Sequence, residues 1–185
     1  MVQGSLLDFL RDGMTKEVYV TIQSTRFGQV EVADKAVIEF PNGLIGLGGS
    51  RYALLAREED SSFIWLHSVD DPSLAVPITN PFQFFNGYEV VVSDDEAERI
   101  GIASPEQADV YVTVTAADAL EDFSANLRAP ILISRGIGHQ VINESDDAPV
   151  RASLFADLAG KMAEVSDGPN GEKPKGGRAK PEKAA

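Results

Sequence analysis

The chain has 185 residues, 43% of them hydrophobic, which is enough for one folded domain with a buried core. It contains no cysteine, which excludes a disulfide scaffold and a thiolate metal site. The formal net charge of -13 disfavours direct binding to nucleic acid, because such a charge repels phosphate. No segment approaches the ~20 apolar residues that cross a bilayer, so we expect no membrane integration. We expect a cytoplasmic location, because the absence of cysteine fits a reducing compartment.

The negative charge is concentrated in one part of the chain. Residues 58–122 hold fifteen acidic side chains and a single basic one, Arg99. Residues 166–185 have the opposite balance, with five basic and three acidic side chains. A concentrated negative surface attracts partners that carry basic groups, although acidic surfaces also simply keep proteins soluble.

Short runs of β-branched and aromatic residues recur along the chain, separated by turn sequences such as Asn42-Gly43 and Asn86-Gly87. The short spacing favours antiparallel pairing over βαβ units, which need a helix-length crossover each time. We therefore predict a mainly β single domain, an antiparallel barrel or sandwich. The predicted strands are 18–22, 30–32, 37–40, 52–55, 63–69, 74–78, 88–92, 110–115, 131–134 and 140–142.

Two segments resemble enzyme motifs, but neither has the residues or the geometry that the chemistry requires. The glycine-rich segment 43–50 has nearly the spacing of a phosphate-binding loop, but Gly49 stands where the lysine is required, so we predict a turn. His67 and Ser68 are neighbours in a predicted strand and would point to opposite faces, which argues against a Ser–His–Asp site. We expect His67 on a strand face, His139 in a loop, and no catalytic, metal or cofactor site.

Two turns, at residues 70–72 and 79–81, interrupt the apolar segment 63–85. Aspartates in the first turn can bond backbone amides, be exposed to a partner, or do both. If strand alternation continues past the second turn, Phe82 and Phe84 share one face and Phe85 takes the other, so at least one set is buried. A ring exposed beside the acids would be an interface anchor.

Residues 94–100 carry the signals of one short helix. Ser93 and Glu96 have the spacing of a capping box, Asp94 and Asp95 suit the positive end of the helix dipole, and Gly101 is a stop signal.

Three weaker elements complete the prediction. We expect a helical turn near residues 116–120 and a peripheral helix over 153–164. The segment 166–185 has three prolines, four glycines and no large apolar residue, so we predict a disordered C-terminal tail.

Five short segments, in order, resemble the flagellar assembly factor FliW family. They are FPNGLIGL (40–47), WLHSVDDPSLAVPITNPFQFF (65–85), YEVVVSDDEAERIGI (88–102), SANLRAPILIS (124–134) and PVR (149–151). The resemblance divides the chain into an N-terminal extension (1–14), a FliW-like β domain (15–155), and a peripheral helix with a disordered tail (156–185).

The resemblance implies a non-enzymatic cytoplasmic regulator, expected to be a monomer, that binds flagellin and the RNA-binding translational repressor CsrA. Binding would relieve CsrA repression of flagellin mRNA translation by allosteric antagonism, without direct contact with nucleic acid. The alternative is a dedicated flagellin chaperone that does not bind CsrA. From charge and expected exposure, we predict a protein-binding site made of Asp70, Asp71, Asn80, Phe82, Asp94, Asp95 and Glu96.

Overall fold

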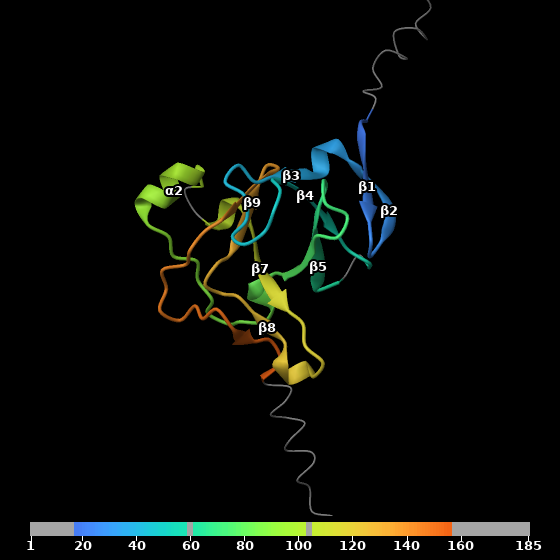
Figure 1. The fold of residues 1–185 in the computed structure, drawn as a ribbon. Helices are drawn as coiled ribbons and strands as arrows, with labels where there is room; N and C mark the ends of the chain where they lie inside the picture. The colour runs from blue at the N-terminus through green and yellow to red at the C-terminus, as the bar shows by residue number, and fades with distance from the viewer. Residues whose placement is uncertain (1–16, 59–60, 103–104, 157–185) are drawn as a thin grey trace, which may run out of the picture.

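A computed structural model describes residues 17–58, 61–102 and 105–156 (Figure 1). The predicted N-terminal extension, residues 1–14, and the predicted tail lie outside these residues. Most of the predicted peripheral helix lies outside them too, and its expected first residue, Ser153, belongs to a strand.

Seven strands form a closed barrel, which confirms the predicted mainly β fold. Their order around the barrel is β3, β4, β5, β6, β7, β9 and β10, and pairing of β10 with β3 closes the ring. The bounds are β3 Val37–Glu39, β4 Arg51–Leu55, β5 Phe63–Ser68, β6 Ala75–Thr79, β7 Asp109–Thr115, β9 Ile131–Ser134 and β10 Ile137–Gln140.

The odd number of strands determines how the barrel closes. Directions cannot alternate all the way around a ring of seven, so at least one neighbouring pair must be parallel. That pair is β3 and β10, with Ile137 opposite Glu39. The Glu39 amide donates to the Gly136 carbonyl across this junction, at 2.9 Å. All the other pairs in the barrel are antiparallel.

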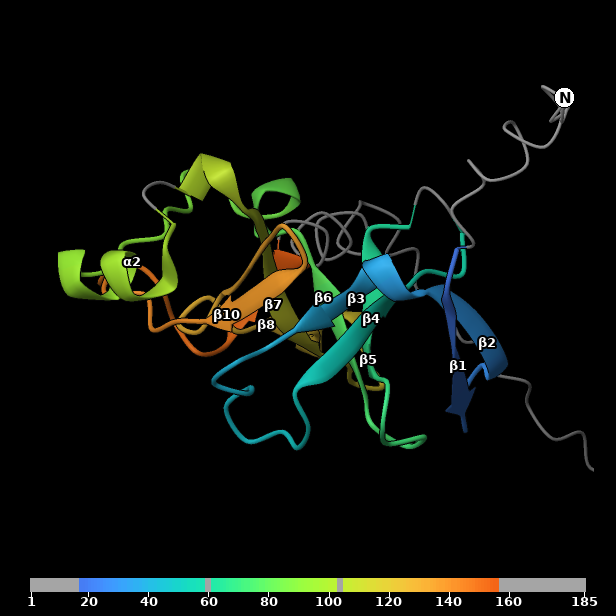
Figure 2. The same cartoon turned by 90° about the horizontal axis from the view of Figure 1, so that it is seen from above.

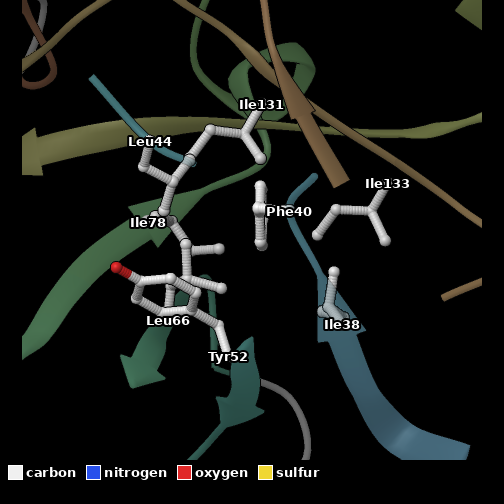
Figure 3. Close-up of a cluster of buried hydrophobic side chains, with 8 residues drawn as sticks. All are labelled: Ile38, Phe40, Leu44, Tyr52, Leu66, Ile78, Ile131 and Ile133. Atoms are coloured by element: carbon white, nitrogen blue, oxygen red, sulfur yellow. The ribbon is translucent and has the colours of Figure 1, made fainter. Parts of the chain in front are cut away.

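Inward-facing side chains from these strands and the β3–β4 loop fill the barrel. Figure 3 shows them pointing toward one another, and Phe40 packs edge-on against Tyr52 with ring centroids 5.4 Å apart. The Tyr52 hydroxyl donates to the Gly48 carbonyl, which ties the loop to the barrel wall. The buried cluster consists of Ile38, Phe40, Leu44, Tyr52, Leu66, Ile78, Ile131 and Ile133.

Gly138 makes room for this core at the closing strand. A Cβ atom at this position would lie 2.4 Å from two ring carbons of Phe40, far inside van der Waals contact. Because Phe40 is fully buried, its ring has no free space to move into.

A separate hairpin covers the outer face of β4 and β5. It consists of β1 (Tyr19–Ser24) and β2 (Gly28–Ala33) and leads through the 3₁₀ turn η1 (Asp34–Ala36) into the barrel. Phe27 of the hairpin lies edge-on to Trp65, and Ile22 is fully buried. The hairpin explains why consecutive residues of β5, Leu66 and His67, are both buried: opposite faces of the strand are covered.

Two short strands that the sequence did not predict extend one end of β7. β8 (Ser124–Ala125) pairs with β7, and β11 (Ala152–Ser153) pairs with β8. They enclose a second apolar cluster that includes Val112, Val114 and Leu154, with Phe84 and Phe155 packed against it.

The predicted strand 88–92 is wrong, and one side chain accounts for the difference. Residues 88–92 have no strand partner. The fully buried Asn143 bonds their backbone instead: its Oδ1 accepts from the Val91 amide at 3.0 Å, and its Nδ2 donates to the Glu89 carbonyl at 2.8 Å. The Glu144 amide also donates to the Val91 carbonyl.

The predictions for residues 140–142 and 116–120 also need correction. β10 covers 137–140 rather than 140–142, so His139 lies in a strand and not in a loop. The helical turn expected at 116–120 is the 3₁₀ turn η4, Leu120–Asp122. A further 3₁₀ turn, η3, covers Pro105–Gln107.

Candidate protein-binding surface

The turn that contains Asp70 and Asp71 is organised by its own side chains. The Ser68 hydroxyl accepts from the backbone amides of Asp70 and Asp71, and the Asp71 carboxylate accepts from the amide and the hydroxyl of Ser73, both at 2.8 Å. These bonds to Ser73 hold the pKa of Asp71 below its usual value. Both aspartates are exposed, so the turn is built as predicted and its carboxylates remain accessible.

The surroundings of this turn are less negative than the sequence suggested. Asp70 lies 3.6 Å from the Arg51 guanidinium. Arg26 and Arg57 line a hollow of about 400 Å³ beside the turn, which Pro72 and Ser73 also border. One arginine therefore contacts Asp70 and two more lie beside the turn, which weakens the local attraction for a basic partner.

Asn80 and Phe82 belong to a 3₁₀ turn instead of a strand. Pro81 opens η2 (Pro81–Gln83), and the Asn80 side chain caps it by accepting from the Phe82 amide at 2.9 Å. Strand β6 ends at Thr79, so the side chains of the phenylalanines do not alternate between two faces of a strand as expected. Phe82 is 49% exposed and packs on Tyr88, whereas Phe84 and Phe85 pack against the second apolar cluster.

The predicted helix is confirmed as α2, Asp94–Ile100. The Ser93 hydroxyl accepts from the Glu96 amide, and Gly101 ends the helix with a φ of 68°, a left-handed conformation that glycine adopts without strain. Glu96 pairs with Arg99, which lowers the pKa of the Glu96 carboxyl. Asp94 and Asp95 are exposed and make no ion pair with any residue that the structure describes.

The structure does not bring all the predicted site residues together. Figure 2 shows α2 at one end of the barrel and the β1–β2 hairpin at the other. The 70–72 turn is tied to the hairpin, because the Thr25 amide donates to the Pro72 carbonyl at 2.9 Å. Asp94 and Asp95 are thus far from Asp70 and Asp71, and a single small interface cannot include both pairs.

The junction of the hairpin and the barrel contains an aromatic and basic cluster that the sequence did not reveal. The Arg26 guanidinium lies 4.0 Å from the centre of the Trp65 ring, a cation–π contact. Phe27 contacts both Trp65 and His67. No local pattern could have shown this cluster, because roughly forty residues separate its two halves in the chain.

His67 has a serine partner, but not the neighbour that the sequence suggested. Its Nε2 lies 2.8 Å from the Ser24 Oγ, and its Nδ1 lies 2.6 Å from the Ser68 carbonyl oxygen. The Ser24 oxygen also accepts from the amides of Arg26 and Phe27, so its lone pairs are already used. This arrangement fastens the hairpin to β5.

We expect Ser24→Ala to lower the free energy of unfolding by ~2 kcal/mol, because two amides and the His67 ring lose their partner. The matched control is Ser50→Ala, where the side chain is exposed. Chemical denaturation measures both variants. Equal stability of the two variants would contradict a fastening role for Ser24.

Neither a metal site nor a spanning helix is found within the described ranges. No group of three or more histidine, aspartate or glutamate side chains among residues 17–58, 61–102 and 105–156 is placed to hold a metal ion. In the same ranges, no helix is both long and apolar enough to span a membrane.

Comparison with known proteins identifies the family. The family model described as FliW protein matches residues 21–154. The chain is 34% identical over 155 residues to a flagellar assembly factor FliW of Desulfitobacterium hafniense (strain Y51), which covers 82% of this chain and 99% of the relative. A FliW of Magnetococcus marinus is 32% identical over 161 residues, covering 85% of this chain and 99% of the relative.

A solved structure agrees with these relatives. The crystal structure of the flagellar assembly factor FliW superposes with a TM-score of 0.66 at 32% identity, and the match covers 73% of this chain and 96% of that one. The seven-stranded barrel and the five sequence segments lie within the matched region. The chain therefore belongs to the FliW family of flagellar assembly factors.

Proposed function

We propose that this protein is a cytoplasmic, non-enzymatic regulator of flagellar assembly that binds flagellin and CsrA. When flagellin is scarce, the free protein binds CsrA and relieves its repression of flagellin mRNA translation by allosteric antagonism. The observation that carries the proposal is the family match over residues 21–154. The net charge of -13 supports it, because such a body attracts protein partners with basic groups and repels RNA.

Calorimetry of the purified protein with flagellin and, separately, with CsrA at low salt tests this proposal. Binding of both partners is the expected result. Binding of flagellin alone would support the alternative, a dedicated flagellin chaperone. Binding of neither would contradict the proposed function as a whole.

Among the residues predicted to bind a partner, we propose Asp94 and Asp95 as the acidic contacts for CsrA. Both are exposed at the start of α2, and neither is paired with a described cation. Phe82, half exposed on η2, is the apolar candidate. Asn80 supports Phe82 because it caps η2, and Glu96 pairs with Arg99 on α2. Asp70 and Asp71 would form a separate contact at the other end of the barrel.

The double variant Asp94→Asn, Asp95→Asn is expected to weaken CsrA association about fivefold at low salt, with a smaller loss at high salt, because exposed charges are screened. The control is Glu121→Gln, Asp122→Asn on η4, which changes the net charge equally and lies far from α2 (Figure 1). Calorimetry compares the two. Unchanged affinity in the α2 variant would place the interface elsewhere. Equal losses of affinity in the α2 variant and the control would indicate that only the overall negative charge of the protein matters.

A further inference from the structure

A hollow of about 440 Å³ lies between the end of α2 and the β9–β10 turn. Its size is within the range of pockets for small ligands, and such pockets combine apolar walls with a few polar groups. Ile100 and Ile102 are buried walls, and Ile137 is 38% exposed beside them. The polar lining includes Arg135 and His139, and no carboxylate is among the described residues that line the hollow.

Arg135 occupies a position that its turn does not favour. Residues 135 and 136 form a two-residue hairpin turn between Ser134 and Ile137, with φ values of 51° and 79°. Such type I′ turns prefer asparagine, aspartate or glycine at the first position, because other side chains are strained at positive φ. Turn geometry therefore does not explain the arginine. Its guanidinium also makes no ion pair with a described residue.

His139 supplies a second polar group. Its Nδ1 is buried and has no hydrogen-bond partner among the described residues. A nitrogen without accessible surface cannot bond a ligand in the hollow, so the ring nitrogen that can do so is Nε2. Burial and the nearby Arg99 lower the pKa of His139, against the opposing effect of Glu96, which favours the neutral ring at pH 7. A neutral ring can carry its proton on Nε2 and donate it to a ligand.

We propose that this hollow binds a carboxylate carried on a short aliphatic group, which accepts hydrogen bonds from Arg135 and His139 while the aliphatic group packs on Ile100, Ile102 and Ile137. Arginine is the side chain best matched to a carboxylate, since its planar fork donates two parallel bonds. The same chemistry is present in the free C-terminus of a polypeptide that ends in leucine and in a free branched-chain acid.

NMR titration with three probes tests the site and distinguishes its sources. N-acetyl-leucine represents a chain end, 4-methylpentanoate represents a free acid, and N-acetyl-leucinamide lacks the carboxylate. We expect N-acetyl-leucine to bind with a Kd of about 1 mM and to shift the amide signals of Gly136, Ile137 and His139. The amide probe should bind at least tenfold more weakly. Tighter binding of 4-methylpentanoate than of N-acetyl-leucine would identify a free acid as the ligand, and the reverse would identify a chain end.

Arg135→Asn separates binding from stability. Asparagine tolerates the left-handed turn, so the variant should unfold at the same or a higher temperature, yet it should bind N-acetyl-leucine at least tenfold more weakly. Arg151→Asn, at an exposed arginine outside the hollow, should bind normally. Equal binding of acid and amide probes, no binding of any probe, or full binding by the Arg135 variant would overturn the proposal.

Discussion

Replacement of Asn143 by alanine is expected to lower the free energy of unfolding by ~3 kcal/mol, a large part of the 5–15 kcal/mol that typically stabilises a domain. The fully buried amide bonds the Val91 amide, the Glu89 carbonyl and the Ser145 amide. Alanine would leave these groups without their partner, and an unsatisfied buried polar group costs more than a hydrogen bond contributes.

Urea denaturation measures this loss, and Asn86→Ala is the control. Asn86 is exposed, and its side chain has no hydrogen bond to a described residue, so the same chemical change should have little effect there. Hydrogen exchange at the Val91 amide should also accelerate in the Asn143 variant. A loss below 1 kcal/mol with normal protection at Val91 would contradict the role given to Asn143.

Gly138→Ala is the second large effect, with an expected loss of ~3 kcal/mol. The new Cβ would lie 2.4 Å from the buried Phe40 ring, so the ring or the closing strand must shift. This shift would disturb the pairing of β3 with β10, which closes the barrel. Gly48→Ala is the matched control, because a Cβ there meets nothing within 4 Å. Denaturation midpoints of the two variants compare the effects.

A double variant identifies the cause of that loss. Phe40→Leu alone should be destabilising because it shrinks the core. In the Gly138→Ala background it should instead recover part of the lost stability, because the smaller side chain removes the clash. Additive losses from the two substitutions would show that contact with Phe40 is not what excludes alanine at position 138.

The sequence predicted the elements whose signals are local. Ser93, the acidic first turn and Gly101 lie within nine residues, and the structure confirms helix α2 over the predicted range. Most strands also appear near their predicted positions, since alternation of apolar residues is a local property. The 70–72 turn was likewise predictable, because Asp71 bonds a residue two positions away.

Elements that depend on distant residues were not predictable. Residues 88–92 have the composition of a strand, but their hydrogen-bond partner is the Asn143 side chain, 52 residues beyond Val91. The parallel closure between β3 and β10 joins residues about a hundred positions apart. Likewise, charge counting could not show that Arg51 pairs with Asp70, nor that Asp94 and Asp70 lie at opposite ends of the barrel.

The most direct test of the proposed partner switch is a competition experiment with fluorescently labelled CsrA. Anisotropy should rise when this protein binds CsrA and should fall back as unlabelled flagellin is added, because both partners draw on one pool of the protein. A rise in anisotropy that saturating flagellin does not reverse would contradict the switch, as would the absence of any rise.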